Sequence, residues 1–502
     1  MHTSCGLSRE GAGTSCRWLE EQCERLEESW KQLTEKASNA SRPKIQRIPQ
    51  YMAERDEFKR YYEPEIISIG PIHHLRKQQL LQGERYKEAW AAMYLKETNQ
   101  SAKALYWRIR ECIPELLNQL AEFLDIVKED IPGARVSVLL FLSPNFQIFQ
   151  MLELTYLAWM LVVDGCSVLH LLDNTDPYLS DEKLKISMGK LIRVHQDVVI
   201  LDNQIPFQVL RLLCDGEDKQ RLERCLQKFL RVYGVDRILR LRKQKHTVKI
   251  IVQGEGDGQQ DNDDDDDDPI HLLDCLRRAL LDERLLEKVK EYNQDKRASN
   301  NVQLVQGLYQ MLHLRKYRIG TIRELKAAGI HVKKHSGDSN SFYPCFCNGI
   351  LELPKLTTDG STAHVFLNLV AYEMCPDFQN DFEISSFLVL LSSLIDHPED
   401  VRELRLAGIV INQLANDKEV ADLFNNMDII MVPETPWFAS IRDQIHSHFE
   451  SKQAKIRMLT WIGEAYNTYF RSPWTIIALL AATLGLILTF IQTWFALHPK
   501  AS

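Results

Sequence analysis

Two cysteines and two histidines between positions 331 and 347 carry the side chains that most often bind zinc. Cys345 and Cys347 flank Phe346, and His331 and His335 precede them. Structural zinc sites usually combine two pairs of such ligands at characteristic spacings. A single Cys-x-Cys without a second pair favours buried, reduced thiols, so we expect no metal site here.

Two further groups have suitable side chains for chemistry but lack the surroundings that chemistry needs. His73 and His74 are adjacent, and adjacent residues on a regular element rarely bind one metal. They follow Gly70–Pro71, which predicts a loop. Asp164–Gly165–Cys166 offers a thiol nucleophile, yet the sequence identifies no histidine to organise it. We interpret this tripeptide as a turn at a helix end.

Familiar catalytic signatures are missing from the sequence. It contains no Gly-x-Ser-x-Gly elbow, Walker loop, dinucleotide-binding fingerprint or His-Glu-x-x-His helix. The carboxylates are numerous but follow no pattern that would pair a general acid with a general base. We therefore predict no catalytic, cofactor-binding or metal-binding residues and expect that the protein is not an enzyme.

The charge and the cysteine content of the chain argue against a nucleic-acid-binding protein and against a disulfide-rich protein. The 502 residues carry a net charge of −8, and the seven aspartates within residues 261–268 account for −7 of it. The remainder is nearly neutral and lacks the basic excess typical of nucleic-acid binding. The eleven cysteines are odd in number and irregularly spaced. That usage indicates reduced thiols in a cytosolic body rather than a disulfide framework.

The elements that would position these residues are mostly helical. Helical periodicity extends from Gln79 to about Arg240. Its most apolar part, Phe146–Leu169, is interrupted by charged residues, so we interpret it as buried helices rather than a membrane span. Residues 329–356 differ, because their apolar pairs indicate short strands around a loop. The sequence predicts a mainly α fold: a multi-helix globular body with a few short strands.

Some local patterns make sharper predictions. Apolar residues between Ile384 and Ile395 recur at helical spacing and predict a stripe that faces the core. Asn416 and Glu419 have the spacing of a capping box at a helix start. Residues 203–206 also predict a helix start, in which the Asn203 side chain is the cap and Pro206 lies in the first turn.

The chain ends in an uncharged segment, residues 472–497. From Trp474 to Leu497 it would form about 36 Å of helix, enough for the roughly 30 Å hydrocarbon core of a bilayer. Trp474 and Trp494 lie where interfacial aromatics are common. Basic residues precede this segment and only Lys500 follows it, which predicts a cytosolic body. We predict a single-pass, tail-anchored protein, in the plasma membrane rather than the endoplasmic reticulum.

Changes of composition divide the chain. Residues 254–268 are acidic and Gly-containing, which predicts a disordered loop, because like charges repel. Apolar residues between Leu19 and Leu33 predict a short amphipathic helix that docks on the body. The predicted parts are an N-terminal tail with this helix (1–43), two helical parts of one domain (44–253 and 269–450) on either side of the acidic loop (254–268), a juxtamembrane segment (451–471), a transmembrane helix (472–497) and a tail (498–502).

Short motifs in a fixed order resemble those of a plant family. Residues 67–74 read Ile-Ser-Ile-Gly-Pro-Ile-His-His, close to a Val-Ser-Ile-Gly-Pro-Tyr-His-His stretch from which Ile72 departs. From about Ile48 to Leu497 the chain resembles the plant proteins grouped as domain of unknown function 247, although Asp202 stands where the family usually has Glu. The matching residues that we interpret as fold-defining are Gly70, Pro71, His73, His74, Asp164, Gly165, Asn203, Gln204, Pro206, Phe207, Gly329, Glu352, Pro354, Glu373 and Gly408.

The resemblance implies a plant membrane protein for which no enzymatic activity is established as a class. Some grass members are implicated as pollen-side determinants of self-incompatibility. Our leading hypothesis is therefore a membrane-anchored protein in protein–protein recognition or signalling, with self-incompatibility as its sharpest version. Its partners would be the lipid bilayer and an unidentified protein, without nucleic acid.

The alternative hypothesis is a membrane-bound enzyme with an unrecognised active site. The polar motif residues His73, His74, Asp164, Asn203 and Gln204 would then converge on one concave pocket.

Overall fold

The structure is a computed structural model. The residues that it describes are 22–31, 45–74, 80–120, 146–175, 183–214, 219–233, 269–281, 319–335, 342–375, 382–427, 435, 437–451 and 473–497. Four predictions concern residues outside this set: the tail before residue 22, the acidic loop 254–268, nearly all of the juxtamembrane segment 451–471 and the final residues 498–502. The side chain of Trp474 is also outside it.

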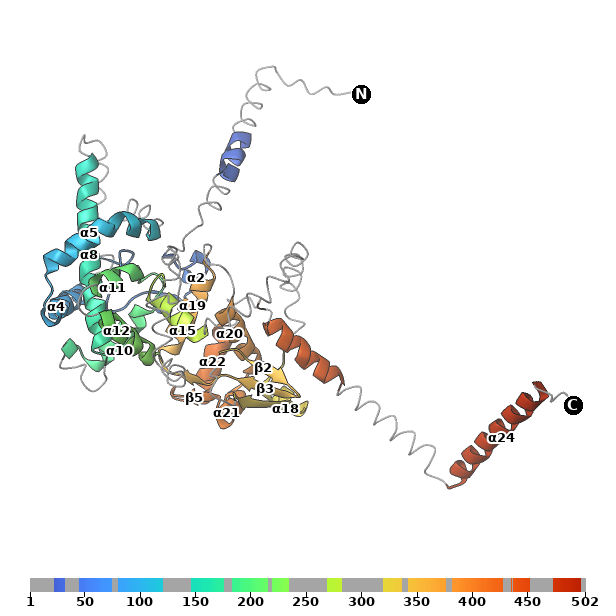
Figure 1. Ribbon diagram of the computed structural model, residues 1–502. Helices are drawn as coiled ribbons and strands as arrows, with labels where there is room; N and C mark the ends of the chain where they lie inside the picture. The colour runs from blue at the N-terminus through green and yellow to red at the C-terminus, as the bar shows by residue number, and fades with distance from the viewer. Residues whose placement is uncertain are drawn as a thin grey trace, which may run out of the picture.

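The N-terminal half consists of helices that surround one long apolar helix (Figure 1). Its helices are α2 (Gln50–Ala53), α3 (Lys59–Tyr62), α4 (Leu81–Thr98), α5 (Ala102–Gln119), α8 (Phe146–Asp173), α10 (Met188–Val198), α11 (Phe207–Cys214) and α12 (Lys219–Val232). Helix α8 carries apolar residues on nearly all sides, so it is stable only when neighbours cover it. Helices α4, α5, α11 and α12 pack against it.

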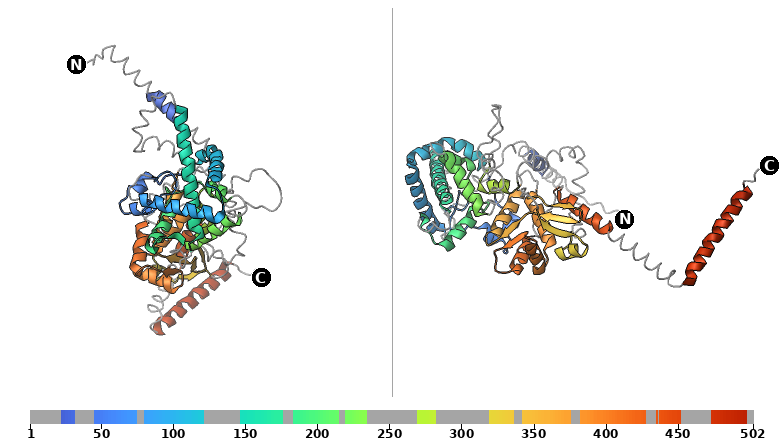
Figure 2. Two further views of the ribbon diagram at one scale, coloured as in Figure 1. Left: turned by 90° about the vertical axis from the view of Figure 1, so that its left-hand side faces the viewer. Right: turned by 60° about the horizontal axis from the view of Figure 1, so that its bottom comes forward.

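The C-terminal half combines helices with two small sheets (Figure 2). Its elements are α15 (Leu272–Leu281), α18 (Ile322–Ala327), β1 (His331–Lys334), β2 (Cys345–Cys347), β3 (Ile350–Leu353), β4 (Leu356–Thr358), α19 (Thr362–Glu373), α20 (Glu383–Leu394), α21 (Pro398–Leu406), β5 (Val410–Asn412) and α22 (Asp417–Met427). One sheet has the order β1-β3-β2, with β1 parallel and β2 antiparallel to β3. The other pairs β4 with β5 in parallel. The predicted strands around residues 329–356 are confirmed.

The two halves share one core. A single cluster of buried apolar side chains extends from Ile48 to Ile445. Asn368 of α19 is fully buried where the halves meet. It accepts a hydrogen bond from the Leu201 N–H at 3.0 Å and donates one to the Tyr61 carbonyl at 2.9 Å. The segments on either side of residues 254–268 therefore form one body, which is mainly helical as predicted.

Several local predictions are confirmed. In and just after α20, the apolar stripe between Ile384 and Ile395 is buried. At the start of α22, Asn416 Oδ1 accepts the Glu419 N–H at 2.9 Å, and its amide donates to the Glu419 carboxylate at 3.2 Å. The apolar stretch within α8 is one continuous helix rather than several, and its side chains from Leu157 to Leu172 are mostly buried, as predicted.

Two predictions about helix ends are wrong. Residues 164–166 lie in the middle of α8 rather than at its end. A Cβ on Gly165 would meet Leu213 Cδ1 at 2.3 Å, so glycine here lets α11 approach α8 closely. Asn203 does not cap α11, which begins at Phe207. Its side chain binds distant backbone instead.

Two predictions about exposure are also wrong. Cys345 and Cys347 are exposed rather than buried, because Phe346 between them faces the core side of the sheet. Residues 22–31 form the predicted helix, but it does not dock on the body, since Leu26 is 71% and Trp30 68% exposed.

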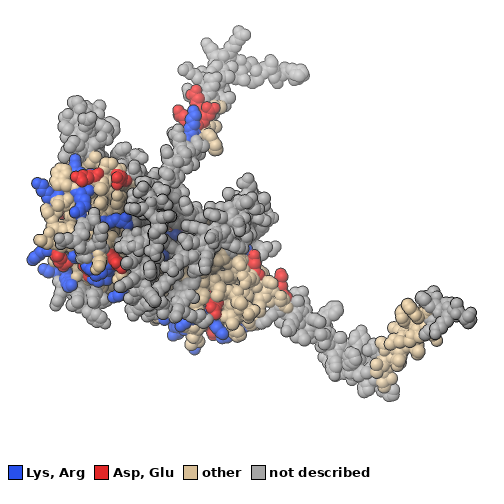
Figure 3. Space-filling view, viewed as in Figure 1, with Lys and Arg blue, Asp and Glu red and all other residues tan. Residues whose placement is uncertain are grey.

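The last helix, α24 (Pro473–Leu497), lies apart from the body in Figure 1. Its described side chains are exposed, and Figure 3 shows it without charge beside a body surface that mixes both signs. By length and hydropathy, one helical stretch in the described part of the chain could span a membrane, the largely buried Leu154–Asp173. Leu480–Trp494 of α24 is a shorter apolar helix.

Candidate functional site

The motif residues of the N-terminal half gather around the backbone segment 65–70. Asp197 of α10 accepts three consecutive N–H groups, those of residues 65–67, at 2.8–2.9 Å. Asn203 Oδ1 accepts the Ile69 N–H at 2.6 Å, and Asp164 accepts the Gly70 N–H at 2.8 Å. These side chains hold a segment that has no sheet or helix of its own to satisfy its donors.

Gly70 lies at the tightest point of this segment. Its φ is +73°, and a Cβ there would lie 2.1 Å from the Gln204 carbonyl oxygen, so no other residue fits without moving the backbone. The Gln204 amide in turn donates to the carbonyls of Val198 and Ile200 at 2.7 and 2.8 Å. Pro71 follows in a turn that leads to His73, which is 9% exposed.

A buried ion pair lies beneath the segment. The Lys87 ammonium is fully buried, 2.6 Å from Asp164 Oδ1 and 3.0 Å from Glu84 Oε1. Burial by itself lowers the pKa of Lys87, but the two carboxylates hold it above its ordinary value. Ser68 donates a hydrogen bond to Glu84 at 2.6 Å. The network therefore fixes segment 65–70 to α4 and α8.

His74 stands at the edge of the network. Its Nε2 is 2.7 Å from the Tyr156 hydroxyl and its Nδ1 is 3.7 Å from Glu84 Oε1. Burial lowers the pKa of His74, an effect that the Glu84 carboxylate opposes. His74, Asp164 and Asn203 thus converge in space, but on a buried backbone segment.

An open hollow of about 440 Å³ lies elsewhere, between α3, α10 and the start of α19. Its walls include Arg60, Arg193 and His364. Burial lowers the pKa of His364 to about 4. None of the predicted motif residues lines this hollow.

The motif residue Glu373 joins three helices in the C-terminal half. It is fully buried at the end of α19 and lies 3.0 Å from the Arg277 guanidinium of α15. Its two oxygens also accept the first N–H groups of α20, from Ile384 and Ser385, at 2.9 Å each. A carboxylate at a helix N-terminus satisfies donors that have no partner within the helix.

The remaining motif residues lie at chain turns and element ends. Gly329 and Gly408 follow α18 and α21 with φ of +73° and +71°, the left-handed conformation that ends many helices. Pro206 precedes α11, and the buried Phe207 begins it, with its N–H bound to the Ile270 carbonyl at 2.8 Å. Pro354 directly follows β3.

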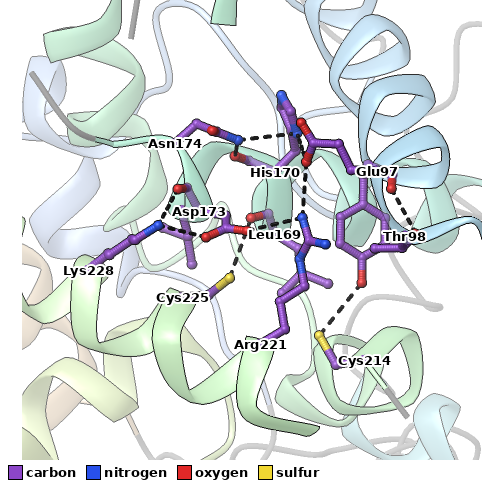
Figure 4. Close-up of polar contacts among 12 residues, drawn as sticks. Glu97, Thr98, Leu169, His170, Asp173, Asn174, Cys214, Arg221, Cys225 and Lys228 are labelled. Carbon is purple, nitrogen blue, oxygen red and sulfur yellow. Dashed lines mark hydrogen bonds and ion pairs between the residues drawn. The ribbon is translucent and has the colours of Figure 1, made fainter. Parts of the chain in front are cut away.

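Sequence reasoning missed a second ion-pair cluster, which joins α4, α8 and α12 (Figure 4). Arg221 Nη2 lies 3.1 Å from carboxylate oxygens of both Glu97 and Asp173, and Lys228 lies 2.7 Å from Asp173. Its members come from three separate helices, so no local spacing reveals it.

The buried cysteines near this cluster have unreactive thiols. Cys225 donates to the Leu169 carbonyl (Figure 4). The Cys214 sulfur lies 3.7 Å from the Tyr94 hydroxyl. Burial raises the pKa of Cys166 to about 12, so its thiol stays neutral. No disulfide joins any two of the nine described cysteines.

One face of the three-stranded sheet gathers ligand-type side chains. Cys345 and Glu352 are directly opposite in the β2–β3 ladder, so their side chains share a face. His335 follows β1 on the same side, with Nδ1 3.4 Å from Glu352 Oε2, while Cys345 Sγ lies 3.9 Å from that oxygen. Within the described part of the chain, these three side chains form a group whose ligand atoms all lie within 4.8 Å of one another.

The thiol of this face is not a reactive thiolate. Partial burial raises the pKa of Cys345 above its ordinary value, and the Glu352 carboxylate and Cys347 raise it further. Because the thiolate is the form that attacks electrophiles, a protonated Cys345 is a poor nucleophile.

The chain is similar to known plant proteins over most of its length. UPF0481 protein At3g47200 of Arabidopsis thaliana is 23% identical over 457 residues, which cover 87% of this chain and 83% of that protein. Putative UPF0481 protein At3g02645 of the same plant is 28% identical over 176 residues, 35% of this chain and 32% of its own length. No solved structure matches. A family model described as a plant protein of unknown function, DUF247, matches residues 45–488, nearly the whole body, and the chain therefore belongs to that family.

Proposed function

We propose that this protein is held to a membrane by α24 and that its body, in the cytosol, binds another protein in recognition or signalling. The observation that carries the anchor is α24 itself. It has 25 residues without a charge and exposes apolar side chains such as Leu486 (72%) and Phe490 (68%). At 1.5 Å per residue the helix is about 37 Å long, enough to cross a roughly 30 Å hydrocarbon core with some tilt.

The orientation follows from the distribution of charge in the sequence. Lys452, Lys455, Arg457 and Arg471 precede α24, and Lys500 alone follows it. Basic residues next to a span remain on the cytosolic side. The length of α24 suits the plasma membrane.

A binding role rather than catalysis is supported by how the motif residues are used. Asp164, Asn203 and Glu373 direct their polar atoms at backbone groups and at buried cations within the body. The hollow beside α10 is lined by other residues. An active site normally presents polar groups to a cavity, so these contacts favour a scaffold whose outer surface meets a partner.

The anchor is tested by comparing the full chain with a variant that ends at residue 472, both expressed in plant cells. The full chain should remain in the membrane pellet after alkaline carbonate extraction, and the truncated chain should move to the soluble fraction. Release of the full chain by carbonate would contradict the anchor.

The orientation of the body is tested in the same cells by protease digestion of sealed vesicles and by glycosylation at Asn99. Asn99 begins an Asn-Gln-Ser sequon and is exposed at the end of α4, so a lumenal body would carry a glycan there. We expect digestion of the body in sealed vesicles without detergent, and equal mobility of the full chain and its Asn99→Gln variant. A protected body with a glycan on Asn99 would reverse the proposed orientation.

The sharpest version of the proposal is a determinant of self-incompatibility. It requires variation among alleles of one population at exposed positions of the body, while buried residues such as Lys87 and Glu373 stay constant. Alleles with uniform body surfaces would remove this version and leave the anchor and the recognition role unaffected.

A further inference from the structure

The geometry points to a zinc site on the three-stranded sheet, with His335, Cys345 and Glu352 as its ligands. We infer this from the contacts of the sheet, independently of the membrane anchor. In β3, Leu351 and Leu353 are fully buried, so Glu352 between them faces outward. Since Cys345 is opposite Glu352 and His335 extends β1 beside β3, three adjacent strands each contribute one ligand to the same face.

The hydrogen bond of His335 fixes which nitrogen is available. Its Nε2 lies 2.9 Å from the Tyr343 carbonyl oxygen, which can only accept, so Nε2 carries the proton. In the neutral ring the lone pair is then on Nδ1, which faces Glu352 Oε2 at 3.4 Å. A histidine that binds a metal commonly donates its other N–H to a backbone carbonyl in this way.

A lone pair on Nδ1 that faces a carboxylate oxygen is stabilised when a proton or a metal ion lies between the two atoms. The spacing suits zinc, because bonds of about 2.0–2.1 Å to N and O and about 2.3 Å to S give tetrahedral edges of about 3.4 Å for N–O and about 3.6 Å for S–O. The observed separations are 3.4 Å between His335 and Glu352 and 3.9 Å between Cys345 and Glu352. The third separation, from His335 to Cys345, is at most 4.8 Å, so the exposed Cys345 side chain must rotate toward the other two ligands to complete the site.

The chemical types of the three ligands indicate which metal ion the site would bind. A thiolate with an imidazole favours zinc over magnesium or calcium, which bind oxygen ligands. Three protein ligands leave the fourth tetrahedral position open to water, and Cys345 is exposed enough for water to reach it. The site is therefore a three-ligand zinc site that remains accessible from the surface.

The test uses the full chain in detergent, without an affinity tag, and Co²⁺ as an optical probe that Zn²⁺ displaces. We expect a 1:1 complex with a thiolate-to-cobalt charge-transfer band, and X-ray absorption of the zinc form with one sulfur at about 2.3 Å. Cys345→Ser, His335→Gln and Glu352→Gln should each lower the affinity at least about tenfold, the loss seen even when an outer partner of a metal ligand is removed.

Cys347→Ser is the matched control, because Cys347 is also exposed on β2, two residues from Cys345, but lies outside the group of three. It should leave affinity and spectrum unchanged, and circular dichroism should show every variant folded. Failure of the folded wild type to bind Co²⁺ stoichiometrically would overturn the site and leave an ordinary His335–Glu352 ion pair. Equal losses for Cys345→Ser and Cys347→Ser would overturn the ligand set.

Discussion

The network around Lys87 and the outer face of the three-stranded sheet use similar side chains in opposite ways. In the network, Asp164 is buried against the Lys87 ammonium and the Gly70 N–H, so each acceptor faces a donor. On the sheet, the Glu352 carboxylate lies 3.4 Å from His335 Nδ1 near solvent, and when the ring is neutral with its proton on Nε2, two acceptors face each other. Buried, complementary contacts define a fold, whereas an exposed gap between acceptors is the arrangement that a ligand can complete.

Removing a side chain of the buried Lys87 network should have the largest effect on stability. Asp164→Ala leaves the Lys87 ammonium buried with Glu84 as its remaining carboxylate partner and removes the acceptor of the Gly70 N–H. We expect the free energy of unfolding, measured by urea denaturation, to fall by about 3–5 kcal/mol. Glu352→Ala, which removes a half-exposed carboxylate, should change it by no more than about 0.5 kcal/mol. Similar losses in the two variants would show that the network does not hold the fold.

A buried histidine gives an intermediate effect that depends on pH. His271 is fully buried, accepts the Asp274 N–H at 3.0 Å, and burial lowers its pKa from 6.5 to about 4. The unfolded chain takes up the proton below pH 6.5 while the folded chain does not, so stability is complete above pH 6.5 and is lost as the pH falls toward 4. With about 1.4 kcal/mol per pH unit, this residue alone contributes a loss of about 3 kcal/mol.

His271→Asn isolates that contribution, because Asn keeps an acceptor for the Asp274 N–H but does not titrate. Between pH 7 and pH 4 the unfolding free energy of the variant should rise by about 3 kcal/mol relative to the wild type. Parallel pH profiles for the two proteins would argue against a neutral, buried His271.

The smallest expected effects on stability come from replacing two glycines of the body, Gly165 and Gly189, by alanine. Gly165→Ala places a Cβ 2.3 Å from Leu213 Cδ1 and should destabilise the protein by about 1–3 kcal/mol, since a crowded core side chain must move. Gly189→Ala, near the start of α10, meets nothing within 4 Å. It should be neutral or stabilise by up to about 1 kcal/mol, because alanine favours helix. Thermal unfolding of both variants decides whether α8 and α11 are packed as closely as the structure shows.

Local patterns predicted the parts of the fold that local contacts decide. The stripe of α20 and the Asn416 cap depend on neighbours within a few residues, and both are confirmed. Local spacing predicts a cap at Asn203, because nothing nearby reveals its partner Ile69, 134 residues away. It predicts a helix end at Asp164 for the same reason, since Lys87 belongs to another helix.

The residues that sequence reasoning missed left weaker signals. Asp197 belongs to no motif, but it lies between Val194 and Val198 on the apolar face of α10, where a charge needs a buried partner. On β2, the order Cys-Phe-Cys alternates as a half-buried strand does, which would have placed both thiols outside. Which of them meets Glu352 depends on strand register, and register depends on the whole sheet.

The hydrogen bonds of Asn368 can form only after a long delay while the polypeptide is being synthesised. Its partner Tyr61 lies 307 positions earlier. At about 5–20 residues per second, the ribosome needs roughly 15–60 s to bring the second partner out after the first. During that interval the early helices wait with apolar surface uncovered, the condition in which partly folded chains aggregate and for which chaperones exist.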